Sequence, residues 1–255
     1  MHSLNRIFRG LTLISIAAGL MYFALPGQHR ALTPQLFGLT QVQPNLFIDD
    51  VSRSAQALDL IAQADRTNRA FFGPLEATPT FLFCYSVECA DDFGIHTSGL
   101  TLRDRFILLS PQGINPMIVT HERAHAELHG FGSWVDYFDP IYPMWFDEGL
   151  ASFISADSRL MIPQTVGEAI WTTDLHTWRD WGAVVTRENW PQVYGASLGL
   201  VTDIIDQSGC SGLYKLIQDV RNGADFDVAL DELPGTALDR MDRKLHVKPC
   251  LFTRS

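Results

Sequence analysis

The chain has little positive charge. Its 255 residues carry 19 Lys and Arg against 29 Asp and Glu, which gives a formal net charge of −10. Proteins that bind nucleic acid use Lys and Arg to neutralise phosphates, so we expect no nucleic-acid partner. Internal repeats and low-complexity stretches are lacking too, and 46% of the residues are apolar and 11% aromatic. This composition excludes a disordered chain and predicts one sizeable buried core.

Cysteine is scarce, and the four cysteines lack the paired C-x-x-C spacing of a cysteine zinc site. An even number of cysteines fits disulfides if the chain leaves the cytoplasm. Four residues separate Cys84 from Cys89, which suits a local bridge after a strand. We also expect a bridge between Cys210 and Cys250 that ties the last helix to the domain, although four cysteines allow three pairings.

One long apolar run stands near the N-terminus. Residues 10–25 carry no charge and follow Arg6 and Arg9, and no acid precedes Asp49. A positive flank before an apolar stretch is an export signal, and about 16 residues is intermediate between a signal-peptide core and a membrane span. Because no clear small-x-small cleavage site follows, we expect residues 1–27 to be an uncleaved signal anchor. A cleaved signal peptide and a buried core helix are the alternatives.

An anchor or a signal peptide would place the rest of the chain outside the cytoplasm. The arginines stay on the cytoplasmic side, so the domain would face the periplasm or the extracellular side. An anchored domain would stay on the cell membrane through this single segment, and a cleaved one would be secreted.

The pattern after the apolar run predicts one domain. Residues 28–44 contain Pro34, Gly38 and Pro44, which favours a linker, and residues 45–255 would form the domain. Strands first and helices later predict an α+β fold. The spacing of apolar residues predicts strands at 46–48, 80–85 and 106–109, and helices at 52–72, 115–129, 145–157, 190–207, 212–222 and 236–246.

A metal-binding motif lies in the predicted helix 115–129, where residues 121–125 read His-Glu-Arg-Ala-His. His121 and His125 are four residues apart and share one helix face, so their imidazoles can bind one tetrahedral zinc. Glu122 follows His121 directly and lies to one side of the helix face that carries the two histidines. From there it can reach a zinc-bound water without ligating the metal. This pattern arises by chance in roughly one such chain in a hundred, and the alternative is an ordinary surface helix.

A catalytic zinc needs a third protein ligand and an open fourth position. His129 is a poor candidate, because it lies eight residues beyond His121. Cα atoms eight residues apart in a helix are separated by about 12 Å along the axis. We expect His129 to support the ligands from outside or to lie at the surface. Glu148 is the better candidate, since a second helix can cross the first, and the small residues Gly149 and Ala151 would let the two backbones approach.

Two segments together carry a family resemblance. Val119–Leu128 and Trp145–Phe153 resemble the gluzincin branch of zinc metallopeptidases, the peptidase MA-like group, in which His-Glu-x-x-His is followed by Glu-Gly-hydrophobic-Ala. The general layout of 45–245 is similar as well. Phe131 stands where the metzincin pattern requires His, which excludes that family. The resemblance implies a zincin-like α+β fold, with a small N-terminal mixed sheet, an active-site helix and a mostly helical C-terminal half.

The resemblance also implies a site. His121, His125 and Glu148 would bind one Zn²⁺, and Glu122 would act as the catalytic base. Gluzincins commonly add a Tyr or His that donates to the oxyanion. Tyr194 is the best candidate for this role here; packing at a helix start is its other interpretation, and Tyr142 and His176 are weaker candidates.

One position departs from the family pattern. Some gluzincins place an Asp one turn after the Glu ligand, where it orients a His ligand. Ser152 stands at this position and departs from the pattern, and Asp147 is the alternative for this role.

The implied activity is zinc-dependent hydrolysis of peptide bonds outside the cytoplasm, with a peptide or protein as substrate. Zinc would lower the pKa of its bound water, and Glu122 would take the proton and later deliver it to the leaving amine. The strand 106–109 resembles the edge strand of zincins and could bind an extended peptide.

Two other functions stay open. One is a zinc-stabilised envelope domain that binds peptides or a partner without turnover. The other is a membrane-anchored assembly factor with a vestigial site. The intact Glu122 favours the enzyme, because a structural zinc has no use for it.

Overall fold

The computed structural model describes residues 27–130, 140–233 and 241–245. The predicted signal anchor therefore lies outside the described residues, apart from Gly27. Within the described part of the chain, no helix is both long and apolar enough to cross a membrane.

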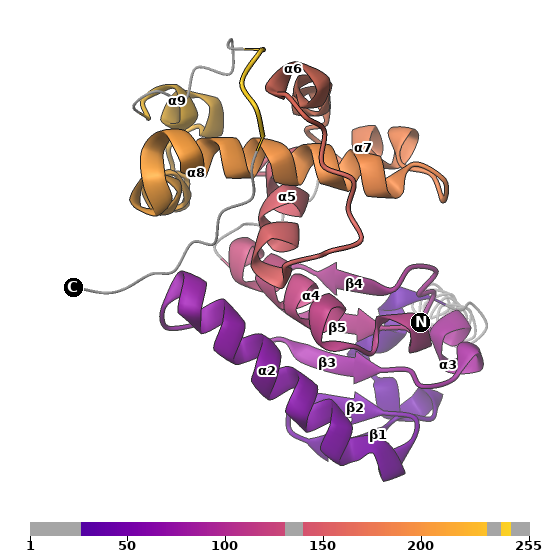
Figure 1. Ribbon diagram of the computed structural model, residues 1–255. Helices are drawn as coiled ribbons and strands as arrows, with labels where there is room; N and C mark the ends of the chain where they lie inside the picture. The colour runs from indigo at the N-terminus through magenta and orange to yellow at the C-terminus, as the bar shows by residue number, and fades with distance from the viewer. Residues whose placement is uncertain (1–26, 131–139, 234–240, 246–255) are drawn as a thin grey trace, which may run out of the picture.

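The N-terminal half is built on a small mixed sheet, as the sequence predicted (Figure 1). Three central strands run parallel, and an antiparallel strand pairs at each edge, in the order β1-β2-β3-β5-β4. The strands predicted at 46–48 and 106–109 are confirmed, and the one predicted at 80–85 ends at Phe83. The strands are β1 (Thr40–Gln43), β2 (Leu46–Ile48), β3 (Thr80–Phe83), β4 (Gly99–Leu102) and β5 (Phe106–Leu109).

The edge of the sheet is not where the sequence suggested. Phe106–Leu109 pairs with β3 on one side and with β4 on the other, so it has no free edge for a peptide. The strand β4 takes the edge position instead. Its sequence, Gly-Leu-Thr-Leu, lacks the continuous apolar run that predicts β5, so the sequence does not predict β4.

Both faces of the sheet are covered. Successive side chains of the central strands point to opposite faces, and each set packs into a core of its own. Phe81, Phe83 and Ile107 pack toward the helices α2 (Ser54–Phe72) and α4 (Pro116–His129), which cover one face. Leu82 and Leu108 pack toward the short helix α3 (Val87–Asp92) and the N-terminal segment on the other face.

The segment 28–44 is not a linker, contrary to the prediction. It forms two 3-10 helices, η1 (Gln28–Leu32) and η2 (Pro34–Phe37), and then β1. Ala31 and Leu39 are buried, and the guanidinium of Arg30 pairs with the carboxylate of Asp92 at 2.6 Å. Pro34 begins η2 rather than keeping the chain extended.

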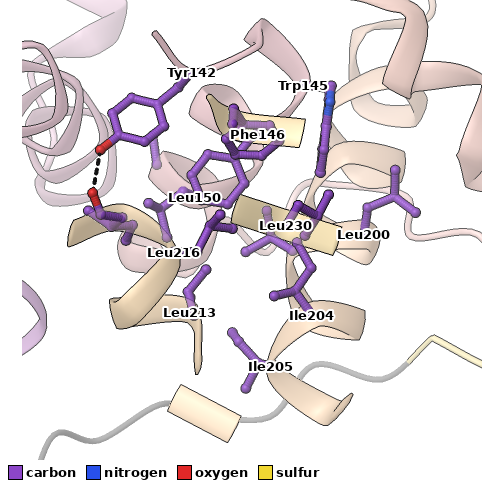
Figure 2. Packing of buried hydrophobic residues seen from close by; sticks show 14 of the residues in the cluster. Tyr142, Trp145, Phe146, Leu150, Leu200, Ile204, Ile205, Leu213, Leu216 and Leu230 are labelled. Carbon is purple, nitrogen blue, oxygen red and sulfur yellow. Dashed lines mark hydrogen bonds between the residues drawn. The ribbon is translucent and has the colours of Figure 1, made fainter. Parts of the chain in front are cut away.

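The C-terminal half is helical, and its core lies between α5 (Met144–Ser155) and α8 (Trp190–Arg221). Trp145, Phe146 and Leu150 pack against Leu200 and Ile204 there (Figure 2). The other elements are η3 (Val51–Arg53), η4 (Pro111–Gly113), α6 (Val166–Ala169), η6 (Ile170–Asp174), α7 (Trp178–Val184) and α9 (Phe226–Asp231).

Two predicted helices merge, and the described part of a third is not helical. The helices predicted at 190–207 and 212–222 run together as α8, with a break at Gly209, whose φ is 73°. Of the helix predicted at 236–246, residues 241–245 form a turn and an isolated antiparallel bridge between Lys244 and Thr165. The guanidinium of Arg243 bonds the carboxylate of Asp203 on α8 at 2.8 Å, which attaches this stretch to the helical half.

The predicted local disulfide is confirmed. Cys84 follows β3, Cys89 lies in α3, and their Cα atoms are 5.3 Å apart. The second predicted bridge, Cys210–Cys250, includes a cysteine outside the described residues.

Candidate metal centre

The helix α4 brings the motif to the middle of the molecule, between the sheet and α5 (Figure 1). The carboxamide oxygen of Asn115 accepts a hydrogen bond from the backbone N–H of Ile118 at 3.0 Å, and Pro116 occupies the first turn. Both features are typical of a helix start. The side of α4 with Ile118 and Val119 packs on the sheet, so the histidines face α5.

Three potential ligand atoms converge between α4 and α5. The Nε2 atoms of His121 and His125 are 3.0 Å apart, and Oε2 of Glu148 lies 3.2 Å and 3.4 Å from them, respectively. All three side chains are buried, and together they could hold a metal ion. With bonds of about 2.0–2.1 Å, ligand atoms of a tetrahedral zinc lie roughly 3.3 Å apart. The donor set therefore fits a small metal ion.

Asp147 holds one of these histidines in place. Its Oδ1 lies 2.8 Å from Nδ1 of His125, and its Oδ2 lies 2.7 Å from Nε2 of His129. A carboxylate at Nδ1 holds a ring proton there and turns Nε2 toward the cluster. Asp147 is thus placed to orient His125, and His129 contacts the cluster through Asp147. The ligand atoms of His125, His129 and Asp147 form a second group that could hold a metal ion.

The charges of the cluster stabilise one another. Burial alone would raise the pKa of Glu148, but the imidazoles of His125 and His121 outweigh it and lower this pKa to about 2. Burial alone would lower the pKa of His125, yet the carboxylates of Asp147 and Glu148 raise it well above its usual value. A carboxylate that stays ionised beside imidazoles is a suitable ligand for a divalent cation.

Glu122 lies beside the cluster, against the edge of the sheet. Its side chain is buried, and the hydroxyl of Thr101 on β4 donates to its Oε2 at 2.7 Å. Nothing in the sequence around Thr101 pointed to this contact, because it joins residues 21 positions apart.

A solvent-accessible cavity of about 700 Å³ opens over the cluster. His121 and Glu122 form part of its lining, so the cavity borders the cluster on the side of His121. Arg159, Asp157 and Trp190 also line the cavity. The guanidinium of Arg159 pairs with the carboxylate of Asp157 at 2.7 Å and lies 4.9 Å from the ring centroid of Trp190.

Tyr194 reaches the site from the first turn of α8. Its ring centroid is 6.3 Å from that of His121, it packs edge-on against Trp181 at 4.9 Å, and it lines the cavity. Burial raises the pKa of Tyr194 well above its usual value, and the carboxylate of Glu148 adds to this, so the phenol keeps its proton. It is therefore available as a hydrogen-bond donor.

No known protein family matches the chain. No curated protein and no solved structure matches it either. The interpretation of the site therefore depends on its geometry.

The other candidates from the sequence lie away from the cluster. The hydroxyl of Tyr142 donates to the backbone carbonyl of Ile217 at 2.9 Å within the core (Figure 2). His176 is exposed and does not line the cavity. The hydroxyl of Ser152 is buried with no hydrogen-bond partner among the described residues, so it orients no ligand.

Gly149 has a different role from the one expected. A Cβ atom there would lie 2.5 Å from the backbone oxygen of Ser197, so the missing side chain allows α5 to approach α8 rather than α4.

Proposed function

We propose that the protein is a zinc-dependent metallopeptidase of the gluzincin type, which hydrolyses peptide bonds of a peptide or protein substrate. His121, His125 and Glu148 would hold one Zn²⁺. The observation that carries the proposal is the convergence of three potential ligand atoms within 3.4 Å beside a second acid, Glu122, that is not among them.

The choice of zinc follows from the donor set. Two imidazoles and one carboxylate are typical of catalytic zinc sites, which keep a further position open, and the cavity over His121 provides it. When bound, zinc would lower the pKa of water and polarise the carbonyl of the substrate.

The remaining groups have roles that follow from their positions. Glu122 takes a proton from the attacking water and passes it to the amine that leaves. Tyr194 keeps its proton and donates to the oxyanion that forms at the attacked carbonyl. Asp147 keeps His125 oriented toward the other ligands.

The arrangement of elements supports a zincin-like fold. The sheet, the motif helix α4 and the Glu148 helix α5 follow one another in the chain. The substrate strand would add to β4, the edge strand beside Glu122, instead of β5. The disulfide between Cys84 and Cys89 supports a location outside the cytoplasm, as a membrane-anchored or secreted protein.

The test combines metal analysis with turnover. The purified full chain should contain about one zinc per molecule and cleave members of a peptide library. Glu122→Gln should keep the zinc and the melting temperature while losing most of the hydrolysis, because an amide cannot accept the proton. Equal cleavage by both proteins would rule out the mechanism. Zinc without any cleavage, together with capture of peptides, would favour the alternative of a non-catalytic binding domain.

A further inference from the structure

The inner face of β4 touches Glu122 at two positions. Gly99 and Thr101 are two residues apart, so they share the face of β4 that is turned toward α4. The Oγ1 atom of Thr101 lies 2.7 Å from Oε2 of Glu122 and 2.9 Å from its backbone oxygen. Thr101 and Glu122 are both buried.

Gly99 brings the strand backbone against the same side chain. A Cβ atom at Gly99 would lie 2.5 Å from Oε1 and 2.6 Å from Cγ of Glu122. The carboxylate therefore has one oxygen at the hydroxyl of Thr101 and the other over the backbone of Gly99. Among the described residues, no donor contacts Oε1, which leaves this oxygen able to accept a proton.

We propose that Thr101 is a positioning residue, which holds the carboxylate of Glu122 for proton transfer; this inference rests on the proposed function. A general base works only within hydrogen-bond reach of the proton that it takes, and a glutamate side chain has three torsions that can move it away. Thr101 is a β-branched residue with restricted χ1, so it presents its hydroxyl from a fixed direction. Its shorter contact is with the side-chain oxygen Oε2, at 2.7 Å, against 2.9 Å for the backbone oxygen.

The first test is Thr101→Val, which removes the hydroxyl and keeps the shape and the strand propensity. We expect kcat on a cleaved peptide to fall roughly ten- to hundred-fold, because small misplacements of a reacting group have effects of this size. KM and zinc content should stay unchanged, and Thr101→Ser, which restores the donor, should recover most of kcat. Thr40→Val, the same change on the exposed edge strand β1, serves as the matched control and should behave like wild type.

The second test is Gly99→Ala. The atoms that its methyl group would meet belong to the flexible end of Glu122, so the protein should fold, bind zinc and move only the carboxylate. We expect kcat to fall by at least as much as in Thr101→Val. This variant keeps the inference testable if Thr101→Val proves to be unstable.

A binding measurement separates this inference from the proposed function. Acetohydroxamate chelates a metal through two oxygens and places a proton beside an adjacent carboxylate, so its affinity for the zinc-loaded protein should fall several-fold in Thr101→Val and recover in Thr101→Ser. Wild-type affinity and wild-type kcat in Thr101→Val would overturn the positioning role. If the wild-type protein cleaves no peptide, the proposed function fails. The affinities for acetohydroxamate then test the positioning role of Thr101 on their own.

Discussion

The two sides of α4 carry two buried polar clusters that differ in one respect. On the far side from the cavity, the carboxylate of Glu127 accepts from the backbone N–H groups of Glu76 and Ala77 and from the guanidinium of Arg123. On the near side, the ligand atoms of His121, His125 and Glu148 point at one another. Donors and acceptors alternate in the first cluster, whereas three potential ligand atoms meet in the second.

This difference separates a structural cluster from a group of side chains that could hold a metal ion. A buried carboxylate surrounded by donors is already satisfied, and it ties α4 to the chain segment before β3. Buried lone pairs that converge need protons or a cation between them. Burial and charge alone do not distinguish the two clusters, since Glu127 and Glu148 are both fully buried acids next to basic groups.

Removing a ligand should have the largest effect on metal binding. We expect Glu148→Ala to lose most of the bound zinc, because two imidazoles alone leave the ion without its third protein ligand. Zinc analysis after dialysis, together with a competing chelator, measures this. Full zinc occupancy in this variant would show that Glu148 is not a ligand.

Glu127→Ala is the matched change on the other side of α4. It leaves the buried guanidinium of Arg123 without one of its two carboxylate partners, so the free energy of unfolding should fall by about 3–5 kcal/mol. Urea unfolding of the zinc-free protein measures it. Zinc affinity of the folded fraction should stay near that of wild type, and a large loss of affinity would mean that the two clusters are coupled through α4.

The sequence predicted the near cluster better than the far one, for a physical reason. The near cluster is encoded by local patterns, namely the spacing of His121 and His125 and the pair Glu148 and Gly149. Local patterns can be recognised in a sequence before its fold is known. The far cluster joins α4 to Asp65 and to the backbone at Ala77, which are distant in the chain and carry no pattern.

The same limit explains the errors in the fold. The helix α4 carries a recognisable motif at helical spacing and the central strands are short apolar runs, and these elements lie close to where the sequence predicts them. The edge strand β4 contains only Leu100 and Leu102 as apolar residues, so the sequence does not predict it and indicates β5 as the edge instead. Thr101 was missed for the same reason, because its role depends on which strand lies beside Glu122.

We expect an intermediate effect on zinc affinity from Asp147, which contacts the proposed ligand His125 but is not itself one of the three proposed ligands. Asp147→Asn should weaken zinc binding by roughly 10- to 100-fold, because an amide holds the Nδ1 proton of His125 less firmly than a carboxylate. The control is Asp157→Asn, the same change at an acid that lines the cavity but pairs with Arg159. Zinc affinities measured by competition should separate the two variants; equal affinities would remove Asp147 from its orienting role.

The smallest effect should come from the hydroxyl of Ser152, one turn after Glu148. This buried hydroxyl has no partner among the described residues, and burying an unpaired polar group is unfavourable. Ser152→Ala should therefore raise the free energy of unfolding by about 1 kcal/mol, a gain to which the higher helix propensity of alanine contributes. Ser155→Ala is the control on the same helix, since its hydroxyl bonds the backbone oxygen of Ser152 at 3.2 Å and its removal should change stability by less than about 0.5 kcal/mol. Zinc affinity should be unchanged in both variants because Asp147, not Ser152, holds His125. A tenfold weaker zinc affinity in Ser152→Ala would instead place this hydroxyl among the groups that support the metal ligands.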